Sequence, residues 1–233
     1  MLNKIPRKKN IKGFTLIELM ISISILTLLL FTGSYTYSLL HSRWDKQLGG
    51  FDANVYMARN LELLQRILEG IHPFIVVDQK KVPSFFFIGA QNSLLAVSQS
   101  GMFSENFPEI FRLTSVQQSS GKFKLIYQAI STENILLRGT EQVINFQKKI
   151  TLFENLDSVN FSYLGWRNYQ EKSDRHNSGH KMIWSSAYSG INTQITPQKL
   201  TLTLTKEGEK LIIPIELDSN SERRLSHYID SDS

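Results

Sequence analysis

A hydrophobic stretch near the N-terminus is apolar on every side. From Leu19 to Leu40 it carries 22 residues without a charge. About 20 helical residues are enough to cross the hydrocarbon core of a membrane. The pattern therefore predicts one membrane-spanning helix near the N-terminus.

Beyond this stretch the pattern becomes that of an amphipathic helix. Apolar residues recur at spacings of three and four, with charged and polar residues between them. We expect the helix to end before Gly70, so that one long helix runs from about Phe14 to about Glu69. Gly33 and the pair at 49–50 are candidate positions for a bend. The apolar positions of this stripe are Leu48, Phe51, Val55, Ala58, Leu61, Leu64, Leu68 and Ile71.

The rest of the chain alternates in the manner of β-strands. Short apolar runs, bounded by Pro, Gly and polar turns, occupy residues 74–78, 84–88 and 94–98. Residues 122–129 place every second side chain on one apolar face, formed by Phe123, Leu125, Tyr127 and Ala129. The order of elements predicts an α+β fold, with a long N-terminal helix packed on an antiparallel β-sheet.

The clearest pair of strands lies near the C-terminus. Leu200, Leu202 and Leu204 alternate with threonines, a turn follows at 206–209, and apolar residues alternate again at 211, 213, 215 and 217. This pattern predicts a hairpin. Pro214 favours an edge position for its second strand. Residues 218–233 are polar and charged and are predicted to be disordered.

Charge is distributed unevenly along the chain. Its 26 Lys and Arg residues exceed its 21 Asp and Glu residues, and the pI is about 9.3. Setting aside the basic residues of the first 13 positions leaves 21 basic residues against 21 acidic ones. The excess therefore belongs to a targeting segment, and we expect no nucleic-acid partner. The basic residues of this leader are Lys4, Arg7, Lys8, Lys9 and Lys12.

Their position also predicts the orientation of the membrane helix. Lys and Arg precede the span, so the N-terminus is expected in the cytoplasm and the remainder on the other side of the membrane. The chain has no cysteine, which excludes disulfides and thiolate chemistry. The absence of disulfides does not decide the compartment.

Glu18 stands near the start of the apolar stretch. A charged residue at the centre of a membrane helix costs roughly 2.5–3.5 kcal/mol on insertion scales, and less near an interface. One interpretation is an interfacial carboxylate that extends to the headgroups. The alternative is that Glu18 has a specific partner.

The residues around Glu18 favour the second interpretation. The stretch from Lys12 to Leu19 reads KGFTLIEL, with a Gly before a Phe and a Glu at the fifth position counted from that Phe. It resembles the signature of type IV prepilins and pseudopilins. A secretory signal peptide would instead carry its cleavage site after the apolar core.

The resemblance implies how the N-terminus is processed. A membrane-embedded prepilin peptidase would cut between Gly13 and Phe14 and methylate the new amine of Phe14. In such assemblies that amine neutralises the Glu corresponding to Glu18 in a neighbouring subunit, which sets the axial register. Phe14 and Glu18 are also four residues apart, so a contact within one helix is possible.

The resemblance also implies a domain organisation and a pilin-like fold. Residues 1–13 would be the cleaved leader and 14–40 the transmembrane and filament-core helix. Residues 41–217 would form a periplasmic head that includes the second half of the helix, and 218–233 a disordered tail. The mature protein would be a single-pass protein of the inner membrane, in contact with its lipids.

Three segments of the head resemble the J-type minor pseudopilin of type II secretion. They are SVNFSYLGW at 158–166, Trp184 in a polar loop, and PQKLTLTL at 197–204. This resemblance implies a tip subunit that joins I- and K-type minor pseudopilins and the major pseudopilin, and that supports export of folded proteins across the outer membrane. A minor pilin of a type IV pilus is the alternative. A membrane-anchored periplasmic enzyme or ligand-binding domain is a third.

Other candidate sites are weaker. His176 and His180 have a spacing that suits zinc on a helix, but Asn177, Ser178 and Gly179 between them favour a loop. The tail imitates the start of a calcium loop from Asp218, yet Arg223 stands where that loop needs Gly. We expect no metal, no cofactor and no enzymatic activity. For Trp166 and Trp184 we expect packing in the core or at an interface.

Overall fold

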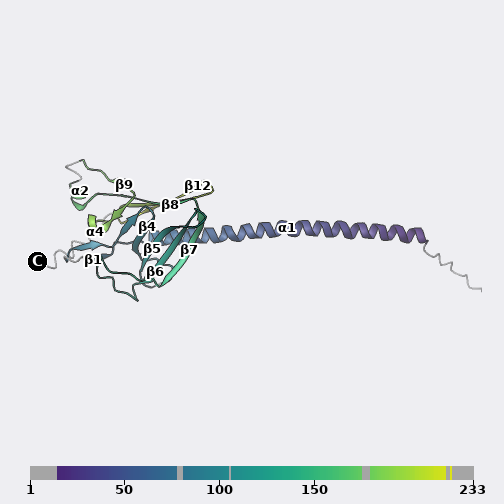
Figure 1. Ribbon diagram of the computed structural model, residues 1–233, viewed down its shortest axis with the longest axis horizontal. Helices are drawn as coiled ribbons and strands as arrows, with labels where there is room; N and C mark the ends of the chain where they lie inside the picture. The colour runs from purple at the N-terminus through teal and green to yellow at the C-terminus, as the bar shows by residue number, and fades with distance from the viewer. Residues whose placement is uncertain (1–14, 78–80, 105, 175–178, 219–220, 222–233) are drawn as a thin grey trace, which may run out of the picture. The chain divides into compact units, whose positions relative to one another are not determined.

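The computed structural model describes residues 15–77, 81–104, 106–174, 179–218 and Ser221, and for residues 40–54 it describes the backbone only. A long helix, α1 (Leu16–Glu69), is followed by antiparallel strands (Figure 1). This confirms the predicted α+β class. The strands are β1 (Ile75–Val77), β2 (Pro83–Phe85), β3 (Ile88–Ala90), β4 (Ser93–Ser98), β5 (Glu109–Gln117), β6 (Phe123–Ser131), β7 (Lys148–Leu156), β8 (Ser158–Gly165), β9 (Ile183–Ser185), β10 (Tyr188–Ser189), β11 (Lys199–Lys206) and β12 (Glu209–Glu216), with short helices α2 (Tyr169–Ser173) and α4 (Gly190–Thr193).

The chain divides into two compact units. The first comprises Met1–Tyr56, and the second, which we call the head, comprises Met57–Ser233. The backbone of α1 is helical across the boundary between them and at Gly33, Gly49 and Gly50. The last turns of α1 thus belong to the head, and the apolar N-terminal turns belong to the first unit.

The apolar stripe of α1 is buried only in its last turns. Leu64, Ile67 and Leu68 are fully buried, whereas Val55 is half exposed and Ala58 is exposed. The stripe from Leu48 onward was expected to be covered by the head, and this expectation is wrong at Val55 and Ala58. Val55 precedes the compact head, which begins at Met57, whereas Ala58 lies in the head and is exposed all the same.

The C-terminus of α1 is tied to strand β4. The Ser98 hydroxyl donates to the Ile67 carbonyl at 2.8 Å, and Gln99 N donates to the Gly70 carbonyl. Gly70 lies so close to this strand that a Cβ there would be 2.5 Å from Ser98 Oγ. Only glycine fits this approach, so the predicted helix end at Gly70 is confirmed with a steric reason.

Two sheets share the main hydrophobic core. Strands β10-β3-β4-β5-β6-β7 form a six-stranded sheet and β12-β11-β8-β9 a four-stranded sheet. Side chains from both sheets and from the end of α1 make one buried cluster. Its largest members include Phe87, Phe111, Tyr127, Phe161 and Tyr163.

The other face of the six-stranded sheet has a smaller core of its own. Ile110 and Ile130 point to this face, because side chains alternate along a strand and their neighbours Phe111 and Ala129 belong to the main core. Phe86, Leu137 and other apolar residues complete the cluster. The sheet is thus covered on both faces.

The predicted strand at 84–88 divides into two. Residues Phe86 and Phe87 separate β2 from β3, and their rings enter different cores. β2 pairs with β1 in a two-stranded sheet, while β3 joins the six-stranded one. The apolar run is continuous because both cores draw on it, and periodicity alone does not reveal the change of sheet.

The C-terminal hairpin is confirmed. β11 pairs with β12 from Lys199↔Glu216 to Lys206↔Glu209, and the connecting Glu207 and Gly208 have φ of 52° and 83°. Positive φ at both positions is the turn that matches the twist of paired strands. Pro214 stands on β12, at the edge of its sheet as predicted. Leu211 is 41% exposed, so the predicted alternation does not bury it.

A buried carboxylate fixes the loop before β5. Glu109 is fully buried and accepts hydrogen bonds from Phe103 N at 2.6 Å, Met102 N at 3.1 Å and the Tyr127 hydroxyl at 2.7 Å. Burial, and then the charge of Glu109, raise the pKa of Tyr127 above its usual value, which keeps this hydroxyl a donor. The carboxylate thereby joins β5, β6 and residues 102–103.

Candidate functional site

The start of α1 is a capping box built on Thr15 and Glu18. Thr15 N and Thr15 Oγ1 both donate to Glu18 Oε2 at 2.9 Å, and Glu18 N donates to Thr15 Oγ1 at 3.4 Å. Thr15 precedes the first helical residue, Leu16, so Glu18 occupies the third position of the helix. Each side chain satisfies a backbone donor that the helix leaves free.

The sequence carries a local signal for this arrangement that hydrophobic periodicity does not reveal. A Thr followed three residues later by Glu, ahead of an apolar run, is the pattern of a capping box. The structure also shows that Glu18 is exposed. One carboxylate oxygen is used within the helix, and the side chain remains open to a further partner.

The other predicted residues of this region lie outside the described residues. They are Gly13 and Phe14 of the expected cleavage site and the leader residues Lys4, Arg7, Lys8, Lys9 and Lys12. Their roles remain predictions.

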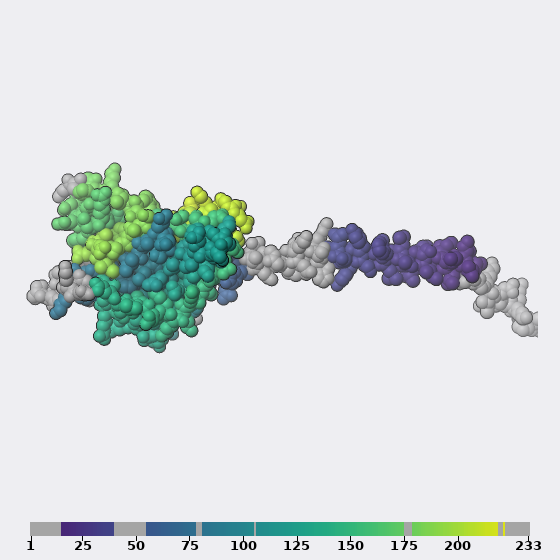
Figure 2. Space-filling model, viewed as in Figure 1, coloured from purple at the N-terminus to yellow at the C-terminus, as the bar shows by residue number. Residues whose placement is uncertain are grey.

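The helix behind Glu18 has the length and composition of a membrane span. Leu16–Leu39 (purple in Figure 2) has a mean hydropathy of 2.1, and its side chains are exposed in the part of the chain that the structure describes. Tyr35 and Tyr37 near its end are 64% and 69% exposed. Aromatic residues of this kind are frequent at membrane interfaces.

Five of the hydroxyl groups within the span are satisfied by the helix itself. Each donates to the carbonyl four residues earlier, at 2.8–2.9 Å. Because lipid offers no hydrogen-bond partners, this pairing lowers the cost of the polar groups in the hydrocarbon core. The residues concerned are Ser22, Ser24, Thr27, Thr32 and Thr36.

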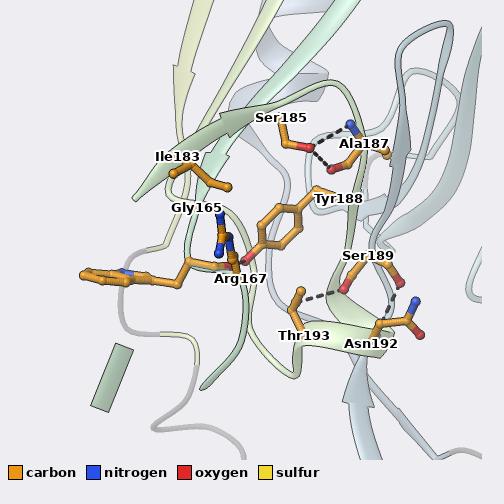
Figure 3. Close-up of a pocket in the computed structure, with 11 residues that line it drawn as sticks. Gly165, Arg167, Ile183, Ser185, Ala187, Tyr188, Ser189, Asn192 and Thr193 are labelled. Atoms are coloured by element: carbon orange, nitrogen blue, oxygen red, sulfur yellow. Dashed lines mark hydrogen bonds between the residues drawn. The ribbon is translucent and has the colours of Figure 1, made fainter. Parts of the chain in front are cut away.

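The head has a cavity of about 320 Å³ where its two larger sheets come together, which we call the edge cavity. In Figure 3, Arg167 and Ile183 lie on one side of the Tyr188 ring, and Ser189, Asn192 and Thr193 on the other. The Tyr188 hydroxyl donates to the Trp166 carbonyl at 2.9 Å. Burial raises the pKa of Tyr188 to about 12, so this donor persists at neutral pH.

A second cavity, of about 470 Å³, lies between the end of α1 and the β11–β12 hairpin. Its floor is apolar, with Leu61, Phe153 and Leu204, and Lys206 and Glu209 stand among its lining residues. The described residues that line it contain no constellation of nucleophile and base, and nothing about them identifies an occupant.

The sequence candidates for metal binding lie partly outside the described residues. Among the described residues no group of three or more His, Cys, Asp or Glu side chains comes together. His180 is exposed, and His176 and Glu222 lie outside the described residues. Ser221, in the predicted disordered tail, is buried and its hydroxyl lies 2.9 Å from the Thr196 hydroxyl.

The two tryptophans differ in their surroundings. Trp166 is 7% exposed and belongs to the main core, whereas Trp184 is 55% exposed on the edge strand β9. We expected each tryptophan to pack in the core or at an interface, and for Trp166 packing in the core is confirmed. Trp184 remains available for an interface.

Comparison with known proteins identifies the N-terminal segment. The family model for the prokaryotic N-terminal methylation motif matches residues 8–33. This range contains the end of the basic leader, the capping box and most of the span. No curated protein matches the chain.

The match supports membership of the type IV prepilin and pseudopilin family, and the α+β architecture with its long N-terminal helix fits a pilin-like fold. The motif implies processing by a prepilin peptidase and assembly with other pilin-like subunits. The apolar helix fits the single-pass membrane anchor of a prepilin-like protein.

Proposed function

We propose that this chain is a J-type minor pseudopilin, a structural subunit at the tip of a type II secretion pseudopilus that supports export of folded proteins. Its anchor lies in the inner membrane, with the N-terminus in the cytoplasm and the head in the periplasm. It acts by assembly and not as an enzyme. The observation that carries the assembly role is an exposed carboxylate, Glu18, at the capped start of an apolar helix.

The capping box explains how Glu18 serves both insertion and assembly. Thr15 supplies two hydrogen bonds to one carboxylate oxygen, which reduces the cost of the charge while the subunit is alone in the membrane. The cut between Gly13 and Phe14 places a cationic methylated amine close to this carboxylate. The same carboxylate then accepts the amine of a neighbouring subunit and sets the axial register.

The J-type assignment is supported by where its three segments lie. Residues 158–165 form β8, Trp184 lies on β9, and residues 199–204 lie on β11. β8 pairs with β9 on one side and with β11 on the other, so the three segments are adjacent strands of one sheet. The three segments that resemble the J-type minor pseudopilin therefore form one continuous part of the sheet.

Two measurements test the proposal. The intact mass of the membrane-extracted protein should correspond to a chain that starts at Phe14 and carries one methyl group. A mature start elsewhere, or a retained Met1, contradicts the processing. The full-length protein in detergent should also co-purify with I- and K-type minor pseudopilins of the same cell. Co-purification with minor pilins of a type IV pilus instead would move the chain to that filament.

A further inference from the structure

The edge cavity lies beside the outermost described strands of both larger sheets. Among the described strands β9 pairs with β8 alone and β10 with β3 alone, and both contribute residues to the lining. The outermost strand of a sheet presents unpaired backbone groups, to which an extended peptide can add as a further strand. The volume of about 320 Å³ lies in the range of ligand pockets, roughly 300–1,000 Å³. This end of the head therefore has the size and the free strand edges that a bound peptide needs.

The described residues that line the cavity carry one charge, and it is positive. Arg167 is exposed and makes no ion pair with any residue that the structure describes. Trp166, also in the lining, is 93% buried, yet its Nε1 has no partner among the described residues. Buried donors normally have an acceptor, and neither Asp nor Glu is among these lining residues. The cavity therefore favours an anionic occupant.

The lining also offers apolar contacts next to this charge. Ile183 is 42% exposed, and Ala187 is exposed as well. The Tyr188 hydroxyl is already bonded to the Trp166 carbonyl, so the ring of Tyr188 remains as an apolar wall. In Figure 3, Arg167 and Ile183 lie on the same side of this ring. An occupant that fits both features has an apolar group close to a carboxylate.

The strand register gives the direction of such an occupant. Ile183 pairs with Gly165 and Ser185 with Tyr163, so Ile183 is the β9 residue opposite the end of β8. Arg167 follows that end by two residues. A peptide strand antiparallel to β9 would finish at the Ile183 end, and its terminal carboxylate would be the group that meets Arg167.

We propose that the edge cavity binds the C-terminal residue of an extended peptide. The terminal carboxylate accepts hydrogen bonds from the Arg167 guanidinium, and the last side chain contacts Ile183 and the Tyr188 ring. The preceding residues add to β9 as an antiparallel strand. Because backbone groups and a chain end supply most of these contacts, the site recognises an apolar C-terminus. The inference concerns the head alone and does not depend on the filament to which the chain belongs.

Peptide binding tests the chemistry of the site. The probe is a fluorescein-labelled hexapeptide, KTVTVI, added to the full-length protein in detergent and followed by fluorescence anisotropy. With a free carboxylate it should bind about tenfold more tightly than with a C-terminal amide, because the amide removes the charge that Arg167 meets. Hexanoate, a free apolar acid, should displace it only at about a hundredfold higher concentration than unlabelled KTVTVI, because hexanoate lacks the backbone hydrogen bonds. Equal affinity of the two peptides, or equally effective displacement by hexanoate, would overturn the proposal.

Substitution of Arg167 assigns the charge to a residue. Arg167→Gln should weaken binding of the free-carboxylate peptide about tenfold and leave the amide peptide unchanged, whereas Arg167→Lys should retain part of the difference. Arg138→Gln is the matched control, since Arg138 is exposed beside Leu137 of the smaller core. The melting temperature of the head should be the same in all three variants, because both arginines are exposed. An equal loss for both peptides, or none for either, would overturn the proposal.

Filling the cavity tests its location. Ala187→Trp should weaken both peptides at least about tenfold, because a large side chain takes the place of the last peptide residue. Ser186→Trp, at an exposed neighbouring position outside the lining, should leave both affinities unchanged. Full affinity in the Ala187→Trp variant would overturn the proposal.

Disulfide trapping tests the direction of the strand. The chain has no cysteine, so Ile183→Cys supplies its single thiol. Under mild oxidation this variant should trap the peptide KTVTVC about tenfold faster than KCVTVI. A disulfide needs Cα atoms within about 7 Å, and the second residue of an extended hexapeptide lies roughly 13 Å from the last. Faster trapping of KCVTVI, or equal rates, would overturn the proposal.

Discussion

The leucines at the two ends of α1 lie in opposite surroundings. Leu28 and Leu29 in the first unit are 65% and 63% exposed, whereas Leu64 and Leu68 in the head are fully buried. The same helical backbone therefore carries exposed leucines at one end and buried leucines at the other. Near the N-terminus the apolar surface needs lipid or other subunits, and near the C-terminus the sheets of the same chain cover it.

The two regions also differ in the groups that donate hydrogen bonds to a carboxylate. Glu18 is held by Thr15, three residues away and on the same helix. Glu109 is held by groups from two other segments, residues 102–103 and Tyr127. Glu18 can therefore change partners without unfolding anything, while Glu109 cannot. The contacts of Glu18 suit a role in assembly, and those of Glu109 suit a role in stabilising the head.

The largest expected effect separates the two ends of the helix. Leu64→Ala should destabilise the head by about 3–5 kcal/mol, because it leaves a cavity in the main core. Leu28→Ala, the matched control, should leave the unfolding of the head unchanged. Denaturant unfolding of the full-length protein in detergent, followed by tryptophan fluorescence, measures both. Equal effects would contradict the division of α1 between the two units.

A somewhat smaller effect is expected from the buried carboxylate. Glu109→Ala should cost about 3 kcal/mol, since it leaves two backbone donors and the Tyr127 hydroxyl without an acceptor. Glu133→Ala, at an exposed position shortly after the end of β6, should be nearly neutral. The same unfolding measurement applies. Loss of stability in both variants would mean that Glu109 has no special role.

The carboxylate of the first unit should matter for assembly and not for folding. Glu18→Val should reduce incorporation into filaments by about tenfold, as removing one member of an ion pair does. Cleavage of the leader and unfolding of the head should be unaffected. Ser22→Val, one turn further along, is the control, because the Ser22 hydroxyl donates only to the Glu18 carbonyl. Recovery of sheared filaments distinguishes the two, and equal incorporation would make Glu18 a merely interfacial residue.

The smallest effect concerns pH and the hairpin. A hydrogen bond from Lys122, then one from Gly208 N, hold the pKa of Asp157 below its ordinary value. A lowered pKa stabilises the fold above the ordinary value, and that contribution is lost as pH falls through the lowered one. The difference in melting temperature between the parent and Asp157→Asn should therefore be present at neutral pH and vanish in acid.

Local patterns in the sequence determined much of this protein. The apolar run from Leu19 to Leu40, the alternation of Leu200 to Leu204 and the turn before Glu209 each depend on neighbours in the chain, so periodicity predicted them correctly. The methylation motif is local as well, and a match over residues 8–33 supports it. The capping box of Thr15 and Glu18 also follows from a local pattern, a Thr followed three residues later by a Glu.

Tertiary structure decided what those local patterns leave open. Val55 and Ala58 continue the apolar stripe to which the buried Leu64 belongs, yet both are exposed, and Val55 precedes the head, which begins at Met57. Phe86 and Phe87 are adjacent but enter different cores, and Ser221 is buried against Thr196 within a segment of polar composition. The edge cavity likewise requires β9 and β10 to meet at the edges of two sheets. Burial depends on which distant segments pack together, and periodicity carries no information about that pairing.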